Sequence, residues 1–392
     1  MTQGSVTFRG GRIFDGLRLI DGHAISFEDG LRVAFGPDAD VPDLGAVIDL
    51  GGDILGPGYV DLQVNGGDGI MLGDDPSVDT LARIARAHRA LGVTHLLPTL
   101  ITDTPEITRA TIAATIDAIR SGVPGIAGLH LEGPHLSVAR KGAHDAALIR
   151  PMTEDDLAEL LAAADALPCL KITVAPENVT EAQVAAMAQA GILVSLGHTD
   201  ADYDTCRRYM SAGARCVTHL FNAMSQLGNR EPGLVGAALA CGEVSSGLIA
   251  DAVHVHPEAI RAAWAAKSGP GRIFLVSDAM AVAGSDKTEF TLKDRTIHRQ
   301  NGQLTLADGT LAGADLDLTT AIRVMVEQVG LPLEDVLGAT TTVPSQLIKL
   351  PLITPAEPNC RLSDLIRFSR DLRAISVFEA VPEETGLRRV GC

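Results

Sequence analysis

Three residues suited to binding a metal ion stand at the ends of short apolar runs. They are Glu132, His198 and His219. One carboxylate and two imidazoles from three separate strand ends suit a catalytic centre of the Zn²⁺ type, in which three protein ligands leave a position open for water. Each residue alone could equally be an ordinary polar side chain satisfied by hydrogen bonds near a loop. Their shared position at strand ends favours the metal centre.

The segment from about residue 56 to 344 alternates strand-like apolar runs with segments of helical period. Parallel strands need helical crossovers, and eight of them close a filled barrel, so the eight runs predict a (β/α)8 barrel. The predicted strands are Tyr59–Val64, Thr94–Thr99, Ala127–Leu131, Lys171–Ala175, Leu193–Leu196, Cys216–Leu220, Gly247–Ala250 and Ile273–Ser277. The predicted helices include Val78–Ala90, Arg109–Arg120, Glu154–Ala166, Glu181–Ala190, Pro257–Lys267 and Thr319–Val329.

A barrel of this kind carries its active site at the carboxyl ends of the strands. Glu132 falls at the end of the third strand, His198 of the fifth, His219 of the sixth and Asp278 of the eighth. Asp278 could alternatively cap a helix or a turn. The position of all four residues predicts that they meet at one mouth of the barrel.

Both ends of the chain differ from this pattern. Short alternating segments broken by Gly-containing turns predict a small β-domain, a β-sandwich built from residues 1–55 and 345–392 around a barrel of residues 56–344. The charged residues from Glu379 onward are predicted to be a frayed tail. The strand-like segments are Val6–Asp15, Ala24–Asp29, Leu31–Gly36, Ala46–Leu50, Asp364–Phe368 and Arg373–Phe378.

The composition limits the partners of the protein. A formal net charge of −17 argues against nucleic acid, which needs a basic face, and an anionic substrate would need a local cluster of positive charge. No run is long enough to span a membrane, and Met1–Gly10 lacks the order of a signal peptide, which predicts a cytoplasmic protein. Six cysteines without a C-x-x-C spacing are predicted to be reduced thiols.

Several short motifs follow one another along the chain. They are Pro57–Gly66, His130–Pro134, Gly197–Thr199, Thr218–Met224, Arg230–Gly233, Ala250–His254 and Ser277–Ala279. This ordered set resembles the N-acetylglucosamine-6-phosphate deacetylase family of the amidohydrolase superfamily over almost the whole chain, to about residue 345. The resemblance implies metal-dependent hydrolysis of N-acetyl-D-glucosamine 6-phosphate to D-glucosamine 6-phosphate and acetate, in amino-sugar catabolism and cell-wall sugar recycling.

The resemblance also implies residue roles. Glu132, His198 and His219 match the metal ligands of the family, and Asp278 matches its catalytic aspartate, which takes a proton from water and passes it to the leaving amine. It implies one divalent ion per subunit, zinc first, with iron, cobalt or manganese as alternatives, and a homodimer in which Arg230 reaches the neighbouring site. The implied substrate-binding residues are Ala143, His144, Asn222, Ala223, Arg230, Asp251, His254, Leu311, Ala312 and Gly313.

Two of these residues, His144 and Arg230, have explanations other than substrate binding. Without the resemblance, His144 is nearly as well explained as an exposed loop histidine, and Arg230 could form a surface salt bridge. With it, Arg230 suits a two-pronged contact to phosphate. Leu311–Gly313 are predicted to lie in the loop before the last barrel helix, where Gly313 lets backbone approach a ligand closely.

The chain departs from other amidohydrolases in two regions. Many carry an H-x-H pair on the first strand for a second metal, whereas this chain has Gln63 and Asn65, which are poorer ligands. Lys171 lies at the wrong end of the fourth strand to bridge two metals, so a single metal is predicted. The segment from about Pro351 lacks the Gly-rich turn and the Ala-Asp-apolar strand that family members usually carry.

Two other classes of function stay open at this point. A dihydroorotase-like or aminoacylase-like amidase would share the metal but would not need Arg230 and His254 as a phosphate clamp. A non-catalytic assembly protein of the same fold would have lost the ligands, and here Glu132, His198 and His219 are all present.

Overall fold

The computed structural model describes residues 4–378 and 389–391. The chain divides into two compact units: the first draws on both chain ends and residues 89–94, and the second holds residues 61–88 and 95–317. The boundaries near residues 55 and 345 stay a prediction. Within the described residues, no helix combines the length and the apolar character needed to cross a membrane.

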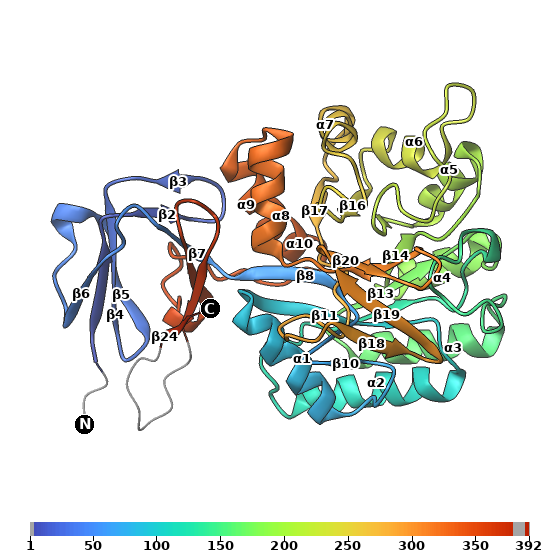
Figure 1. Cartoon of the computed structure of the whole chain (residues 1–392), viewed down its shortest axis with the longest axis horizontal. Helices are drawn as coiled ribbons and strands as arrows, with labels where there is room; N and C mark the ends of the chain where they lie inside the picture. Colours follow the sequence, from blue (N-terminus) through green and yellow to red (C-terminus); the bar gives the residue numbers. More distant parts are fainter. Residues whose placement is uncertain (1–3, 379–388, 392) are drawn as a thin grey trace. The chain divides into compact units, whose positions relative to one another are not determined.

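An eight-stranded sheet forms the barrel that carries the site (Figure 1). Parallel ladders join its neighbours from the second strand to the eighth. The first and last strands meet through a parallel bridge between Val64 and Ala279, and the Asn65 amide donates to the Ala279 carbonyl at 2.8 Å. The predicted (β/α)8 barrel is confirmed. Its strands are β8 (Tyr59–Val64), β11 (Val93–Ile101), β12 (Leu129–Glu132), β13 (Leu170–Val174), β14 (Leu193–Leu196), β15 (Cys216–Val217), β16 (Ser245–Leu248) and β17 (Ile273–Leu275).

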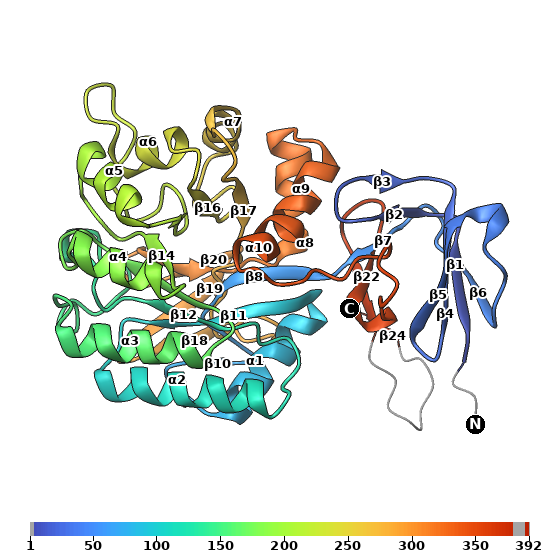
Figure 2. The same cartoon turned by 180° about the vertical axis from the view of Figure 1, so that it is seen from behind.

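Helices connect these strands, and α3, α4 and α5 follow one another along the outside of the barrel (Figure 2). Thr153 and Thr180 begin α3 and α4 with reciprocal capping boxes, and Asp202 caps α5, because their side-chain oxygens accept otherwise unpaired amide hydrogens. The helices are α1 (Val78–Ala90), α2 (Pro105–Arg120), α3 (Glu154–Ala166), α4 (Glu181–Gln189), α5 (Tyr203–Ala212), α6 (Gly233–Ala240), α7 (Pro257–Ala266), α8 (Leu318–Val324), α9 (Leu333–Thr340) and α10 (Thr342–Leu347).

Strands from both chain ends form the small β-domain, where the blue and red segments of Figure 1 lie together. One sheet has the order β5-β4-β1-β6 and the other β24-β23-β22-β7-β2-β3. A shared core joins them, with Phe8 and Phe27 from one end and Leu362 and Leu365 from the other, which confirms the sandwich. The strands are β1 (Val6–Arg9), β2 (Arg12–Phe14), β3 (Leu19–Ile20), β4 (His23–Glu28), β5 (Leu31–Pro37), β6 (Ala46–Asp49), β7 (Ile54–Pro57), β22 (Leu365–Phe368), β23 (Ile375–Phe378) and β24 (Arg389–Gly391).

The segment predicted as a frayed tail is ordered in part. Arg389–Gly391 form β24, which pairs with β23, so the prediction is wrong for these residues. Residues 379–388 and Cys392 lie outside the described residues. The other five cysteines are free thiols, as predicted.

The unit that holds the barrel contains a second sheet, which the sequence did not predict. In the chain it follows the last barrel strand and precedes α8. It is antiparallel, with the order β18-β19-β20-β21, and packs Phe290 and Ile297 against Met280. The Asn301-Gly302 turn, with positive φ at both residues, was the available sequence signal for its hairpin. Leu311–Gly313 therefore lie on a strand, and their prediction as a loop is wrong. The strands are β18 (Glu289–Leu292), β19 (Arg295–Gln300), β20 (Gln303–Thr305) and β21 (Leu311–Ala314), and a short ladder of β9 (Gly66–Gly67) and β10 (Ile70–Met71) precedes α1.

Candidate active site

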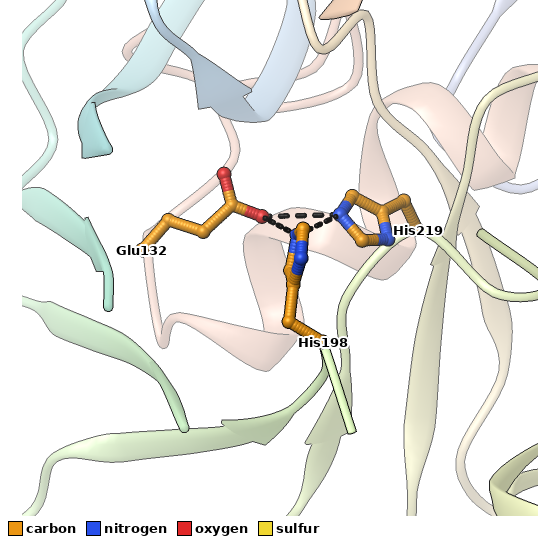
Figure 3. Close-up of side chains that lie close together, drawn as sticks. All are labelled: Glu132, His198 and His219. Atoms are coloured by element: carbon orange, nitrogen blue, oxygen red, sulfur yellow. Dashed lines mark hydrogen bonds and ion pairs between the residues drawn. The ribbon is translucent and has the colours of Figure 1, made fainter. Parts of the chain in front are cut away.

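Glu132, His198 and His219 point their ligand atoms at one another (Figure 3). Glu132 Oε1 lies 3.1 Å from His219 Nε2 and 3.3 Å from His198 Nε2, and the two imidazole nitrogens are 3.0 Å apart. Glu132 ends β12, and each histidine follows the end of its strand by two residues. All three side chains are buried. The predicted cluster is thus assembled by the barrel.

The electrostatics of this cluster favour a positive charge at its centre. Burial alone would raise the pKa of Glu132, but hydrogen bonds from His198 and His219 outweigh it and hold that pKa well below its usual range. Burial lowers the pKa of His219, but the hydrogen bond with Glu132 and the charge of that carboxylate outweigh burial and raise it. A cation held by the three residues satisfies the same preference.

The orientation of His198 also fits metal binding. Its Nδ1 donates to the Arg140 carbonyl at 2.8 Å, which leaves the Nε2 lone pair free in the neutral ring. The Ser137 amide donates to the His198 carbonyl at 2.8 Å. His198 and His219 have φ of 48° and 30°, a left-handed conformation that costs energy outside glycine. The fold stabilises these two turns, and they direct the two imidazoles toward the same point.

Asp278 lies beside the cluster, also in a left-handed conformation with φ of 49°. Asn65 Nδ2 donates to Asp278 Oδ1 at 2.8 Å, and Gln63 Nε2 donates to the same oxygen at 3.0 Å and to Glu132 Oε1 at 3.2 Å. Burial raises the pKa of Asp278, and the charge of Glu132 raises it further. Gln63 therefore links the two carboxylates and Asn65 holds Asp278, roles that the sequence did not reveal.

His144 lies on the other side of Glu132, with its Nε2 3.9 Å from Glu132 Oε2. The Thr102 amide donates to His144 Nδ1 at 3.3 Å, so the proton of the neutral ring resides on Nε2. Burial, reinforced by the nearby His198, lowers the pKa of His144 to about 3. His144 is therefore a neutral, buried donor rather than an exposed loop histidine.

A cavity of about 400 Å³ opens over these residues. Arg140 also lines the cavity and was not predicted as a site residue. Its position in the turn after the strand that carries Glu132 could have indicated it. Three predicted substrate residues are not among the lining residues: Arg230 is exposed, Ala312 is buried in the core of the second sheet, and Asp251 binds His254. The predicted residues that do line it are Glu132, Ala143, His144, His198, His219, Asn222, Ala223, His254, Asp278, Leu311 and Gly313.

The fold and the site together are those of a (β/α)8 hydrolase with a candidate metal centre. The amidohydrolase family matches residues 54–353. The N-acetylgalactosamine-6-phosphate deacetylase of Shewanella sp. (strain ANA-3) is 41% identical over 82% of this chain and 81% of its own length. The N-acetylglucosamine-6-phosphate deacetylase of Haemophilus influenzae is 34% identical over 80% and 81%. The solved N-acetylglucosamine-6-phosphate deacetylase of Pasteurella multocida superimposes with a TM-score of 0.87 at 32% identity, over 95% of this chain and 98% of that one. The chain therefore belongs to the amidohydrolase family, among its amino-sugar-6-phosphate deacetylases.

Replacing His198 by Ala should abolish metal retention, because it removes one of three ligands and the amides of Gln63 and Asn65 are poor substitutes. The measurement is the metal content of purified protein after dialysis. His298→Ala is the matched control, since His298 is a half-exposed histidine on β19 paired with Glu289. Full metal occupancy in the His198 variant would contradict the assignment of the cluster.

Proposed function

We propose that the protein hydrolyses the N-acetyl group of N-acetyl-D-glucosamine 6-phosphate, releasing D-glucosamine 6-phosphate and acetate, in amino-sugar catabolism and cell-wall sugar recycling. The observation that carries the proposal is the convergence of Glu132, His198, His219 and Asp278 in one cavity, with His144 as a neutral donor beside them. The relatives of known name support the choice of substrate. A cytoplasmic location stays a prediction.

A single divalent ion fits the ligand set of Glu132, His198 and His219. We propose zinc, with iron, cobalt and manganese as alternatives, because a carboxylate and two imidazoles accept all four. When bound, the ion acts as a Lewis acid that makes water a better nucleophile and polarises the acetyl carbonyl. Gln63 and Asn65 use their amide hydrogens on Asp278 and Glu132, which supports one ion rather than two.

Asp278 is positioned to move the proton of the reaction. As the oxygen of water bonds to the acetyl carbon, the Asp278 carboxylate takes one proton from that water. The carbon–nitrogen bond then breaks, and Asp278 gives the proton to the departing sugar amine. Gln63 and Asn65 both donate to Oδ1 of Asp278, so Oδ2 remains for the proton. The raised pKa of the buried carboxyl suits a group that must accept a proton.

His144 is positioned to stabilise the developing negative charge. Its Nε2 carries the proton and faces the Glu132 side of the cavity, so it can donate to the acetyl carbonyl oxygen. Because the pKa of His144 is lowered to about 3, the ring stays neutral at physiological pH. It therefore adds a hydrogen bond beside the metal ligands without adding a second positive charge.

The sugar phosphate needs positive charge that this chain has to concentrate locally. We propose that Asn222 and the Ala223 backbone hold the sugar, with Ala143, Leu311 and Gly313 as walls, and that His254 and Arg230 hold the phosphate. Arg230 is exposed and outside the lining of its own cavity, which supports its reaching the site of a partner subunit in a homodimer. A guanidinium suits phosphate because it donates two parallel hydrogen bonds.

N-acetyl-D-galactosamine 6-phosphate is a second candidate substrate. The observation that favours it is that the Shewanella relative named for this sugar is 41% identical, against 34% for the Haemophilus relative. The two sugars differ only in the orientation of the hydroxyl at carbon 4. Steady-state kinetics on both epimers, with and without the 6-phosphate, test the proposed function. Absence of turnover on both 6-phosphates would refute it.

Arg230→Ala should weaken apparent affinity for the 6-phosphate about 10- to 100-fold, since a charge-assisted contact contributes roughly 1.5–3 kcal/mol. Turnover of unphosphorylated N-acetylglucosamine should hardly change. Arg207→Ala serves as the control, because it removes another arginine from the same unit on the helix α5. An equal loss on both sugars would show that Arg230 has a structural role, or that the enzyme is an amidase without a phosphate clamp.

Asp278→Asn should retain the metal while turnover falls by roughly 10²–10⁴-fold, because the amide keeps the size of the side chain but cannot accept a proton. Metal content and turnover measured on the same preparation check this. Near-normal turnover would place the base elsewhere.

Gly313→Ala should lower turnover on the order of 10- to 100-fold, since a displacement near 1 Å at a catalytic group has effects of this size. A Cβ there would lie 2.4 Å from Met280 Cγ and 3.1 Å from the Asp278 carbonyl oxygen. Gly309→Ala is the matched control, because Gly309 also has positive φ but faces open space. Thermal unfolding should show a backbone cost in both variants and a larger loss of stability in Gly313→Ala, which also has the clash with Met280. Equal turnover in the two variants would contradict the prediction.

A further inference from the structure

Asp251 and His254 form a buried pair in the turn that follows β16. His254 Nδ1 donates to Asp251 Oδ2 at 2.6 Å, and Asp251 Oδ1 accepts from the amides of Val253 at 2.9 Å and His254 at 2.8 Å. The two side chains are 7% and 8% exposed. Ala252, between them, has a left-handed φ of 60°. The turn therefore holds the imidazole in one orientation.

The two members of this pair face different surroundings. His254 lines the cavity and Asp251 does not. Because Nδ1 is bound to Asp251, the edge of the ring that carries Nε2 is left for the cavity. Burial alone would raise the pKa of Asp251, but the hydrogen bond and charge of His254 outweigh it and lower that pKa. Asp251 thus remains a carboxylate that acts on the cavity only through His254.

Other cations along the cavity are already engaged. Among the described residues that line it, Arg140 carries the permanent positive charge, and its guanidinium donates to Asp200 at 2.8 Å. His198 and His219 belong to the metal cluster, and His144 lies against Glu132 of that cluster, with its Nδ1 bound by the Thr102 amide. Within this subunit, His254 is the imidazole left to meet an anionic oxygen of the substrate.

We infer that Asp251 is a positioning residue for substrate binding: it holds His254 through Nδ1, so that the Nε2 edge of the ring meets the substrate phosphate. This inference rests on the proposed function. A neutral ring with its only proton on Nδ1 would present a lone pair to the phosphate and repel it. Where Nε2 donates to a phosphate oxygen, both ring nitrogens are donors, and the Asp251 carboxylate on Nδ1 is the counter-charge of that bound ring.

This role and a simple charge effect predict opposite results. Removing a negative charge near an anion site should strengthen phosphate binding if only the total charge matters. Removing the Asp251 carboxylate should weaken phosphate binding if that carboxylate acts by holding His254 in the orientation that donates to the phosphate. Asn at position 251 keeps an oxygen for the amides of Val253 and His254, so the turn is preserved while the charge is lost.

The test is Asp251→Asn, with kcat and KM measured for N-acetyl-D-glucosamine 6-phosphate and for the unphosphorylated sugar. We expect KM for the phosphorylated sugar to rise about tenfold with kcat nearly unchanged, since charge-assisted hydrogen bonds are about twice as strong as neutral ones. The unphosphorylated sugar should show no such rise. Glu258→Gln is the control, because it removes an exposed carboxylate on α7, a few residues further along the chain.

A double-mutant cycle with His254→Gln separates positioning from a structural role. The Asp251 effect on KM should vanish in the His254→Gln background, because Asp251 acts only through the imidazole. Full persistence of the effect there, or an unchanged or lowered KM in Asp251→Asn alone, would overturn the inference. A wild-type protein that leaves the sugar phosphate intact would instead refute the proposed function, so the two failures are distinguishable.

Discussion

The active site depends on the close approach of a carboxylate oxygen and two imidazole nitrogens. Glu132 and His219 are 3.1 Å apart and the imidazoles of His198 and His219 3.0 Å, all inside a buried pocket. Such an arrangement of lone pairs is costly unless a proton or a cation lies among them. The opposite pKa shifts of Glu132 and His219 express this need for positive charge.

The barrel supplies the rigidity that this arrangement requires. The bridge between Val64 and Ala279 brings the first and last strands together, which places Asn65 beside Asp278. Left-handed turns at His198 and at Asp278 are unfavourable locally, and the surrounding hydrogen bonds maintain them. Residues that carry the chemistry are therefore among those held in a strained backbone conformation.

Polar contacts from neighbouring groups then orient three of the imidazoles. The Arg140 carbonyl accepts from Nδ1 of His198, and Asp251 accepts from Nδ1 of His254. The Thr102 amide donates to Nδ1 of His144. These contacts determine which ring nitrogen is left to face the cavity. Each partner acts on a different imidazole, so these three of the four imidazoles that line the cavity take different roles. A histidine gains its function here from the partner of its second nitrogen rather than from its position in the sequence.

Much of this protein was determined by the sequence alone. The periodic runs predicted the barrel, and strand-end positions predicted the convergence of Glu132, His198, His219 and Asp278, because side chains at the ends of parallel strands meet at one mouth. The partners of these residues were not predictable in this way.

Only the tertiary structure decided three features. It placed Leu311–Gly313 on a strand of a second sheet, made Gln63 a donor to two carboxylates, and put Asp251 behind His254 rather than in the cavity. The physical reason is that strand periodicity is a local property, readable from neighbouring residues. A hydrogen-bond partner depends instead on which segments, remote in the chain, the fold brings within about 3 Å.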